Sequence, residues 1–208
     1  GQLLQYLLMV AVSFALGFAL TYMFGYEDEV EEAAGAITEA ETDRLTEEAV
    51  TGAVVAPSEG VIQTPIVGDV VALSNVNDPV FSSGAMGQGI AVKPSEDVVY
   101  APADAEVTIV FPTGHAYGLR TANGAEILIH VGIDTVSMNG EGFNHKVAQG
   151  DKVKAGDVLG TFDSAKIAAA GLDNTTMVIV TNTADFASVN PVASGSVAKG
   201  DAIIEVKA

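Results

Sequence analysis

Residues 125–134 read Ala-Glu-Ile-Leu-Ile-His-Val-Gly-Ile-Asp, a run of branched aliphatic residues that one histidine, His130, interrupts. The run is short, follows the turn-forming triplet Ala-Asn-Gly at 122–124, and is broken by Gly132. These features predict a strand rather than a helix. A histidine on an apolar strand is more often a satisfied core residue than a functional one. The surrounding sequence must therefore decide what this ring does.

Similar short runs recur from about Val54 onward and are separated by Gly, Pro, Asn and Asp. They are rich in Val and Ile, as strands are, and include residues 70–73, 89–92, 107–110 and 177–180. No long segment with a 3.6-residue period competes with them, although residues 164–170 are expected to form a turn or two of helix. The pattern predicts an all-β domain, an antiparallel sandwich or barrel of many short strands.

Two glycine-punctuated segments, residues 147–159 and 195–204, repeat the phrase Val-x-x-Gly-Asp. A Gly-Asp pair supplies a position with positive φ and a capping side chain, as a tight turn requires. The repeated phrase resembles the turns of barrel-sandwich hybrid domains, a group that includes biotinyl and lipoyl carriers. The modifiable lysine that those carriers present at a hairpin tip has no counterpart here.

The N-terminal quarter of the chain has a different character. Residues 1–26 carry no charge and are mostly Leu, Ala, Val, Phe and Met, so they predict one transmembrane helix with tyrosines at the interfaces. Residues 27–53 hold ten acidic residues and one arginine, which predicts an acidic linker. The expected domains are thus a membrane helix (1–26), a linker (27–53) and a β domain (54–208).

Composition excludes several classes of function. The 27 acidic and 9 basic residues give a net charge of −18, so nucleic acid is not expected to be a partner. The chain has no cysteine. Disulfides, thiolate chemistry and cysteine-built zinc sites are therefore excluded from it.

Two histidines are the candidates for chemistry. His115 ends one apolar run and His130 ends the next, across the turn at 122–124. Strand ends so far from a turn need not pair directly, but both rings are expected to reach one pocket. A neutral imidazole is a nucleophile without the help of a base, and an apolar wall favours the neutral form. If a phosphoryl group arrived, its charge would need hydrogen-bond donors, which His115 and the hydroxyl of Thr113 offer.

The sequence at 126–143, Glu-Ile-Leu-Ile-His-Val-Gly-Ile-Asp-Thr-Val-Ser-Met-Asn-Gly-Glu-Gly-Phe, carries a specific family resemblance. With Thr-Gly-His-Ala-Tyr at 113–117, Gly-Gln-Gly-Ile-Ala-Val-Lys-Pro at 87–94 and Ala-Pro-Ala-Asp-Ala-Glu-Val at 101–107, it resembles the enzyme IIA domain of the glucose/sucrose/β-glucoside type of the bacterial sugar phosphotransferase system. The resemblance covers about residues 54–208. The hydrophobic helix and acidic linker resemble fused permeases, in which the last helix of a IIC domain precedes IIA.

The resemblance implies a phosphotransferase component working on the cytoplasmic side of the cell inner membrane. The carrier protein HPr would phosphorylate His130, and His130 would pass the phosphoryl group to a cysteine of a IIB domain, which phosphorylates the incoming sugar. His115 would support the phosphoryl group and Thr113 would orient His115. No cofactor or metal is required by this chemistry.

A docking surface for HPr and IIB is also expected. It would include Asp134, the apolar residues Phe111, Val136 and Met138, and Gln88. Gln88 departs from the glucose-specific relatives, which have an acidic residue between the two glycines. One electrostatic contact to a cationic HPr is therefore expected to be missing.

The sequence leaves two alternative functions open, a zinc peptidase and a regulatory binding module. The phrase His130-Val-Gly-Ile-Asp134 also matches two metal ligands of zinc peptidases on a related hybrid fold, but only His145 follows, and catalytic zinc wants three protein ligands. The paired histidines could also capture Zn²⁺ if another protein supplied further ligands. The other alternative is a regulatory binding module that transfers no phosphate.

Overall fold

The computed structural model describes residues 56–208, and these form an all-β domain with short helical turns. The strands are β1 (Gly60–Gln63), β2 (Gly68–Val71), β3 (Gln88–Pro94), β4 (Val98–Tyr100), β5 (Ala105–Val110), β6 (Ala116–Thr121), β7 (Glu126–His130), β8 (Phe143–His145), β9 (Lys152–Val153), β10 (Val158–Phe162), β11 (Thr176–Val180), β12 (Ser188–Pro191), β13 (Ser196–Val197) and β14 (Ala202–Lys207). The helices are α3 (Pro79–Ser82) and α4 (Ser164–Ala169), with 3-10 turns η1 (Leu73–Asn75), η2 (Thr135–Met138) and η3 (Thr183–Asp185). The all-β prediction and the helix expected near 164–170 are confirmed.

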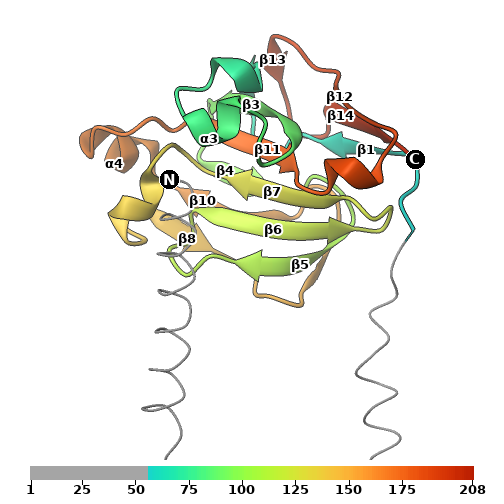
Figure 1. Cartoon of the computed structure of the whole chain (residues 1–208). Helices are drawn as coiled ribbons and strands as arrows, with labels where there is room; N and C mark the ends of the chain where they lie inside the picture. The colour runs from blue at the N-terminus through green and yellow to red at the C-terminus, as the bar shows by residue number, and fades with distance from the viewer. Residues whose placement is uncertain (1–55) are drawn as a thin grey trace, which may run out of the picture. The chain divides into compact units, whose positions relative to one another are not determined.

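The strands form three open sheets (Figure 1). The largest has the order β13-β2-β3-β11-β7-β6-β5-β9, and two three-stranded sheets have the orders β1-β14-β12 and β4-β10-β8. Every pairing is antiparallel, as the sequence predicted. The barrel half of the prediction is wrong for residues 56–208, because each sheet has two free ends and none closes on itself. Short strands cannot show from their own sequence which distant strand they will pair with.

The β6–β7 hairpin positions the two candidate histidines. Its turn is closed by hydrogen bonds from the Thr121 amide to the Ala125 carbonyl (2.9 Å) and from the Gly124 amide to the Thr121 carbonyl (3.1 Å). Gly124 has a φ of 83°, a conformation that favours glycine. Along β7, buried and half-buried residues alternate, and β7 also pairs with the fully buried β11. The hairpin is therefore held rigidly from its turn to its open end.

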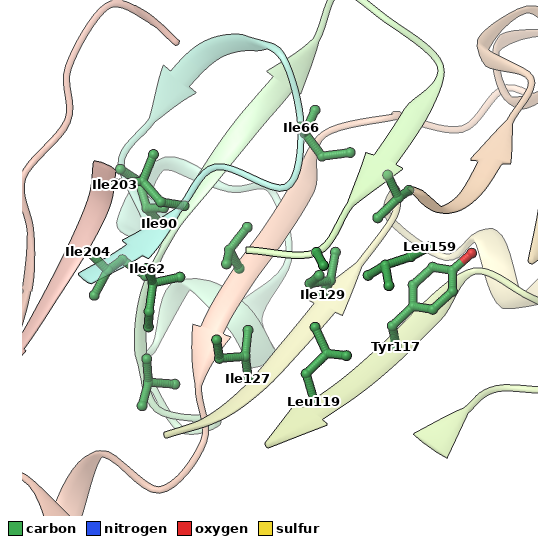
Figure 2. Packing of buried hydrophobic residues seen from close by; sticks show 14 of the residues in the cluster. Ile62, Ile66, Ile90, Tyr117, Leu119, Ile127, Ile129, Leu159, Ile203 and Ile204 are labelled. Atoms are coloured by element: carbon green, nitrogen blue, oxygen red, sulfur yellow. The ribbon is translucent and has the colours of Figure 1, made fainter. Parts of the chain in front are cut away.

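The main core lies between the sheets and is built largely from branched aliphatic side chains (Figure 2). Ile62 and Ile204 come from the β1–β14 sheet, while Ile127 and Ile129 point inward from β7. Tyr117 is the one large polar-tipped member, and burial raises the pKa of its phenol to about 12. A smaller cluster packs on the other face of the large sheet and contains Val76, Phe81, Ala91, Met177 and Ile179.

The pairings repeat themselves within the domain. The unit β1–β2 pairs with β14 and β13, and the unit β4–β5 pairs with β10 and β9 in the same way. The two units also exchange reciprocal hydrogen bonds, from the Gln63 amide to the Pro102 carbonyl (2.9 Å) and from the Tyr100 amide to the Pro65 carbonyl (2.8 Å). The repeated structure gives a physical reason for the repeated Val-x-x-Gly-Asp phrase.

That phrase forms the same turn three times. The carboxylates of Asp151, Asp157 and Asp201 each accept a hydrogen bond of 2.8 Å from the amide three residues earlier. The glycine before each aspartate has a positive φ. The side-chain cap and the glycine conformation inferred from the sequence are therefore both confirmed.

The two ends of the described domain lie together. Gly60 of β1 pairs with Val206 of β14, and Figure 1 shows the C-terminus beside the first described residues. The entering chain is also bonded to the β6–β7 turn, since the Ser58 amide donates to the Asn123 carbonyl (3.1 Å). Entry and exit are thus at the turn end of the hairpin.

No helix within residues 56–208 is long and apolar enough to cross a membrane. The predicted transmembrane helix (1–26) and acidic linker (27–53) lie outside the described residues.

Candidate functional site: a histidine pair at the open end of a hairpin

The hairpin brings the two candidate histidines into contact at its open end. His130 is the last residue of β7 and pairs with Ala116, the first residue of β6, while the Val131 amide donates to the His115 carbonyl (2.8 Å). The ring centroids are 4.8 Å apart and the planes meet at 82°. The two rings are thus in contact, as the turn at 122–124 led us to expect. The sequence left open whether the strands pair this far from the turn, and they do.

The orientation of the His130 ring is set by a backbone carbonyl. Its Nδ1 lies 2.9 Å from the carbonyl oxygen of Gly132. A carbonyl oxygen can only accept, so Nδ1 carries the proton and donates. In the neutral ring, Nε2 is then left with a free lone pair.

Gly132 has a structural reason to be glycine. Its φ is 77°, and a Cβ there would lie 2.4 Å from Cγ2 of Thr135 and 2.9 Å from the backbone oxygen of Asp173. Thr135 is fully buried and its hydroxyl donates to the Val131 carbonyl (2.5 Å). The residue whose carbonyl holds His130 therefore has no room for a side chain.

His115 is the more buried member of the pair, with 3% of its surface exposed. Its Nδ1 lies 2.5 Å from the hydroxyl oxygen of Thr113, the partner that the sequence suggested. When the Thr113 hydroxyl donates to Nδ1, the ring proton resides on Nε2. His115 then presents an N–H donor on the edge away from Thr113.

Burial keeps both rings neutral. It lowers the pKa of His115 to about 4, and the neighbouring His130 adds to this lowering. Burial also lowers the pKa of His130, against the opposing effects of the Gly132 carbonyl, Asp78 and Asp134. Two neutral imidazoles at pH 7 provide one nucleophilic nitrogen and one hydrogen-bond donor side by side.

Aromatic rings enclose the pair. Phe111 meets His115 edge to face at 5.5 Å, and Phe143 lies 6.5 Å from it. Phe81, from α3, lies 5.1 Å from the His130 ring at an angle of 54°. Sequence reasoning missed Phe81, because it is more than 45 residues away and its one-turn helix leaves no periodic signal.

The sequence that contains this histidine pair is similar to a known protein family. The family model described as "phosphoenolpyruvate-dependent sugar phosphotransferase system, EIIA 1" matches residues 60–186, a stretch that includes both histidines.

The chain belongs to this EIIA family.

Curated relatives agree. The β-glucoside-specific EIIBCA component of Dickeya chrysanthemi is 49% identical over 134 residues, which are 64% of this chain and 21% of the relative. The glucose-specific EIIA component of Oceanobacillus iheyensis is 43% identical over 145 residues, which are 70% of this chain and 88% of the relative. The chain thus spans about a fifth of the fused relative and most of the separate one.

A solved structure shows the same fold. The glucose permease IIA from Mycoplasma capricolum superposes with a TM-score of 0.65 at 33% identity, covering 71% of this chain and 96% of that one. The all-β EIIA fold of residues 56–208 is therefore shared with a solved member.

The docking residues expected for the EIIA domain fall into two groups. Val136 is 54% exposed on η2, and the exposed Asp134 precedes it with a φ of 57°. Phe111 and Met138 are half-buried and face inward more than expected, with Met138 packed on the main core. Gln88 is exposed, but it pairs with Val180 of β11.

Gln88 is therefore not beside the histidines. His130 pairs with Met177, three residues from Val180, so Gln88 lies about 10 Å farther along the sheet. Val80, beside Phe81 on α3, is an exposed apolar residue (54% exposed) that sequence reasoning did not consider. A proline after an aspartate at 78–79 was the signal that a helix starts there.

The zinc-peptidase alternative finds no support. No cluster of three or more His, Cys, Asp or Glu side chains in residues 56–208 is arranged to hold a metal ion. His145, the third ligand that this alternative would need, is exposed on β8.

Proposed function

We propose that the EIIA domain relays a phosphoryl group through Nε2 of His130, taking it from the phosphohistidine of HPr and giving it to a cysteine of a IIB domain. The observation that carries the proposal is the hydrogen bond from Nδ1 of His130 to the Gly132 carbonyl. It leaves Nε2 unprotonated and fixed in direction. A preoriented neutral imidazole needs no base before it attacks.

Each transfer balances without a metal ion. The Nε2 lone pair attacks phosphorus, the P–N bond to the donor imidazole breaks, and its electron pair stays on the donor nitrogen. In the second step a thiolate attacks, the P–N bond to His130 breaks, and the electron pair returns to Nε2. Because donor and acceptor are both reactive, positioning and charge stabilisation are what the protein must supply.

His115 and Thr113 supply the charge stabilisation. An N–H on Nε2 of His115 can donate to a phosphoryl oxygen on His130, since the rings lie 4.8 Å apart. The Thr113 hydroxyl, 2.5 Å from Nδ1, keeps that proton on Nε2. A donor already in place costs no reorganisation during transfer.

The docking surface consists of Val80, Asp134 and Val136. Exposed apolar residues beside a reactive group favour a protein partner over a small molecule. The exposed Asp134 gives the surface a negative charge that suits a cationic partner such as HPr. Gln88 and the half-buried Phe111 and Met138 are proposed only at its edge.

The N-terminal regions complete the proposal. Residues 1–26 are assigned as the last helix of a IIC domain in the cell inner membrane, and residues 27–53 as the acidic linker to a cytoplasmic domain at 54–208. The EIIBCA component of Bacillus subtilis supports this assignment, because its name places IIA after IIC. It is 43% identical to this chain over 183 residues, which are 88% of this chain and 27% of the relative. The repeated pairing of β1–β2 and β4–β5 supports a duplicated barrel-sandwich hybrid as the fold type.

The test is phosphorylation by phosphoenolpyruvate, enzyme I and HPr. The protein should gain one acid-labile, base-stable phosphoryl group, mapped to His130 by mass spectrometry. His130→Ala should gain none, and His145→Gln should label normally because His145 lies on β8, outside the His115–His130 pair. A full label on folded His130→Ala would show that another residue is the acceptor.

A further inference from the structure

Phe81 is the third restraint on the His130 ring. The Gly132 carbonyl holds Nδ1 and the His115 ring meets one side, while Phe81 packs at 5.1 Å. Phe81 itself is 8% exposed and belongs to the smaller apolar cluster with Met177 and Ile179. The direction of Nε2 therefore depends on where α3 places Phe81.

The helix α3 is too short to be stable without interactions outside its own backbone. It has four residues, a single turn, and a turn of this length is not stable in isolation. Asp78 precedes it, and its Oδ1 accepts hydrogen bonds from the amides of Val80 (2.7 Å) and Phe81 (3.3 Å). The cap is thus bonded to the backbone of the very residue that contacts His130.

We propose that Asp78 is a positioning residue for phosphoryl transfer: by capping α3 it holds Phe81 against His130 and keeps Nε2 aligned. This inference rests on the proposed role of His130 as the acceptor. It assigns to Asp78 a role distinct from that of a surface charge facing a partner.

Two substitutions separate the cap from the charge. Asparagine caps helices about as well as aspartate, so Asp78→Asn keeps the acceptor and removes the charge. Asp78→Ala removes both. A role in positioning predicts that these variants differ, and a role through charge alone predicts that they behave alike.

The matched control is Asp163→Ala. Asp163 caps α4 by accepting from the Lys166 amide (3.0 Å), so this variant loses the same kind of cap. The ring and hydrogen-bond partners described for the two histidines, Phe81, Phe111, Phe143, Thr113 and the Gly132 carbonyl, all lie outside α4. Any general effect of losing a cap will appear in Asp163→Ala as well.

The experiment measures the maximal rate of phosphoryl transfer at saturating phospho-HPr. Asp78→Ala should lose up to about fivefold, the equilibrium factor that corresponds to the ~1 kcal/mol of a typical N-cap. Asp78→Asn and Asp163→Ala should keep the maximal rate of the parent protein. Equal losses in Asp78→Asn and Asp78→Ala, or no loss in Asp78→Ala, would overturn the proposal.

A second readout needs no transfer at all. In NMR spectra of the unphosphorylated protein, the ring current of Phe81 should shift the His130 ring protons in the parent and in Asp78→Asn. The shift should shrink in Asp78→Ala and should be absent in Phe81→Leu. An unchanged shift in Asp78→Ala would refute the positioning role even if His130 proved not to be the acceptor, whereas an unlabelled parent protein would refute only the proposed function.

Discussion

The substitution Gly132→Ala tests whether the backbone beside His130 is as constrained as the packing indicates. A residue with a Cβ at a φ of 77° costs about 1–2 kcal/mol of strain. The new Cβ would also lie 2.9 Å from the Asp173 oxygen, which already accepts a hydrogen bond from the Ile133 amide (2.8 Å), and 2.4 Å from Thr135 Cγ2. Overpacking of this kind adds about 1–3 kcal/mol, which gives a total loss of about 2–5 kcal/mol.

The control is Gly171→Ala. Gly171 has a φ of 75° but nothing lies within 4 Å of its Cβ position, so this variant bears the strain without the clash. At about 2–4 °C per kcal/mol for a domain of this size, Gly132→Ala should melt about 2–12 °C below Gly171→Ala in thermal unfolding followed by circular dichroism. It should also accept phosphate about ten- to a hundredfold more slowly, because the displaced carbonyl misaligns Nε2. Equal melting temperatures for the two variants would refute the packing argument.

Three further predictions concern the histidines and their partners. His115→Gln should still accept a phosphoryl group but pass it on about a hundredfold more slowly; timing the two half-reactions separately measures this, and complete failure to accept would contradict it. The pKa of His115 is about 4 in the folded protein and near 6.5 in the unfolded chain, so the unfolded chain binds the proton first as the pH falls. The free energy of unfolding should therefore be highest above about pH 6.5 and should fall by up to about 3 kcal/mol toward pH 4, as measured by urea titrations. His115→Gln should lack that share of the pH dependence, and an unchanged profile would argue against a buried neutral ring. The phosphorylated protein should make no sugar phosphate until a IIB domain is added, because the chain has no cysteine; sugar phosphate without IIB would contradict the relay.

The predictable features of this protein were local ones. Runs such as residues 107–110 and 177–180 predicted strands, because short Val/Ile segments between turn residues rarely adopt another regular structure. The meeting of His115 and His130 followed from one hairpin. The link between Thr113 and His115 is likewise a matter of neighbouring residues.

The features that sequence reasoning missed depend on contacts between distant residues. β2 pairs with β13, more than 120 residues away, and nothing in either strand indicates the partner. Phe81 meets His130 although the two are distant in sequence, and it packs in the smaller cluster with Met177 and Ile179 of β11. Gln88 was expected on the docking surface, and only the register of β3 on β11 shows its distance from the histidines.

Because Gly60 pairs with Val206, the two ends of the described domain are adjacent. Paired residues of antiparallel strands lie about 5 Å apart, so the chain enters and leaves the domain almost at one point. That point is at the turn of the β6–β7 hairpin, near Asn123, and five residues of β7 separate the turn from the reactive end. A domain with adjacent ends can be spliced into another polypeptide, or cut open and rejoined in a new order, at little cost to its fold. Both ends of the described domain therefore lie at the opposite end of β7 from His130.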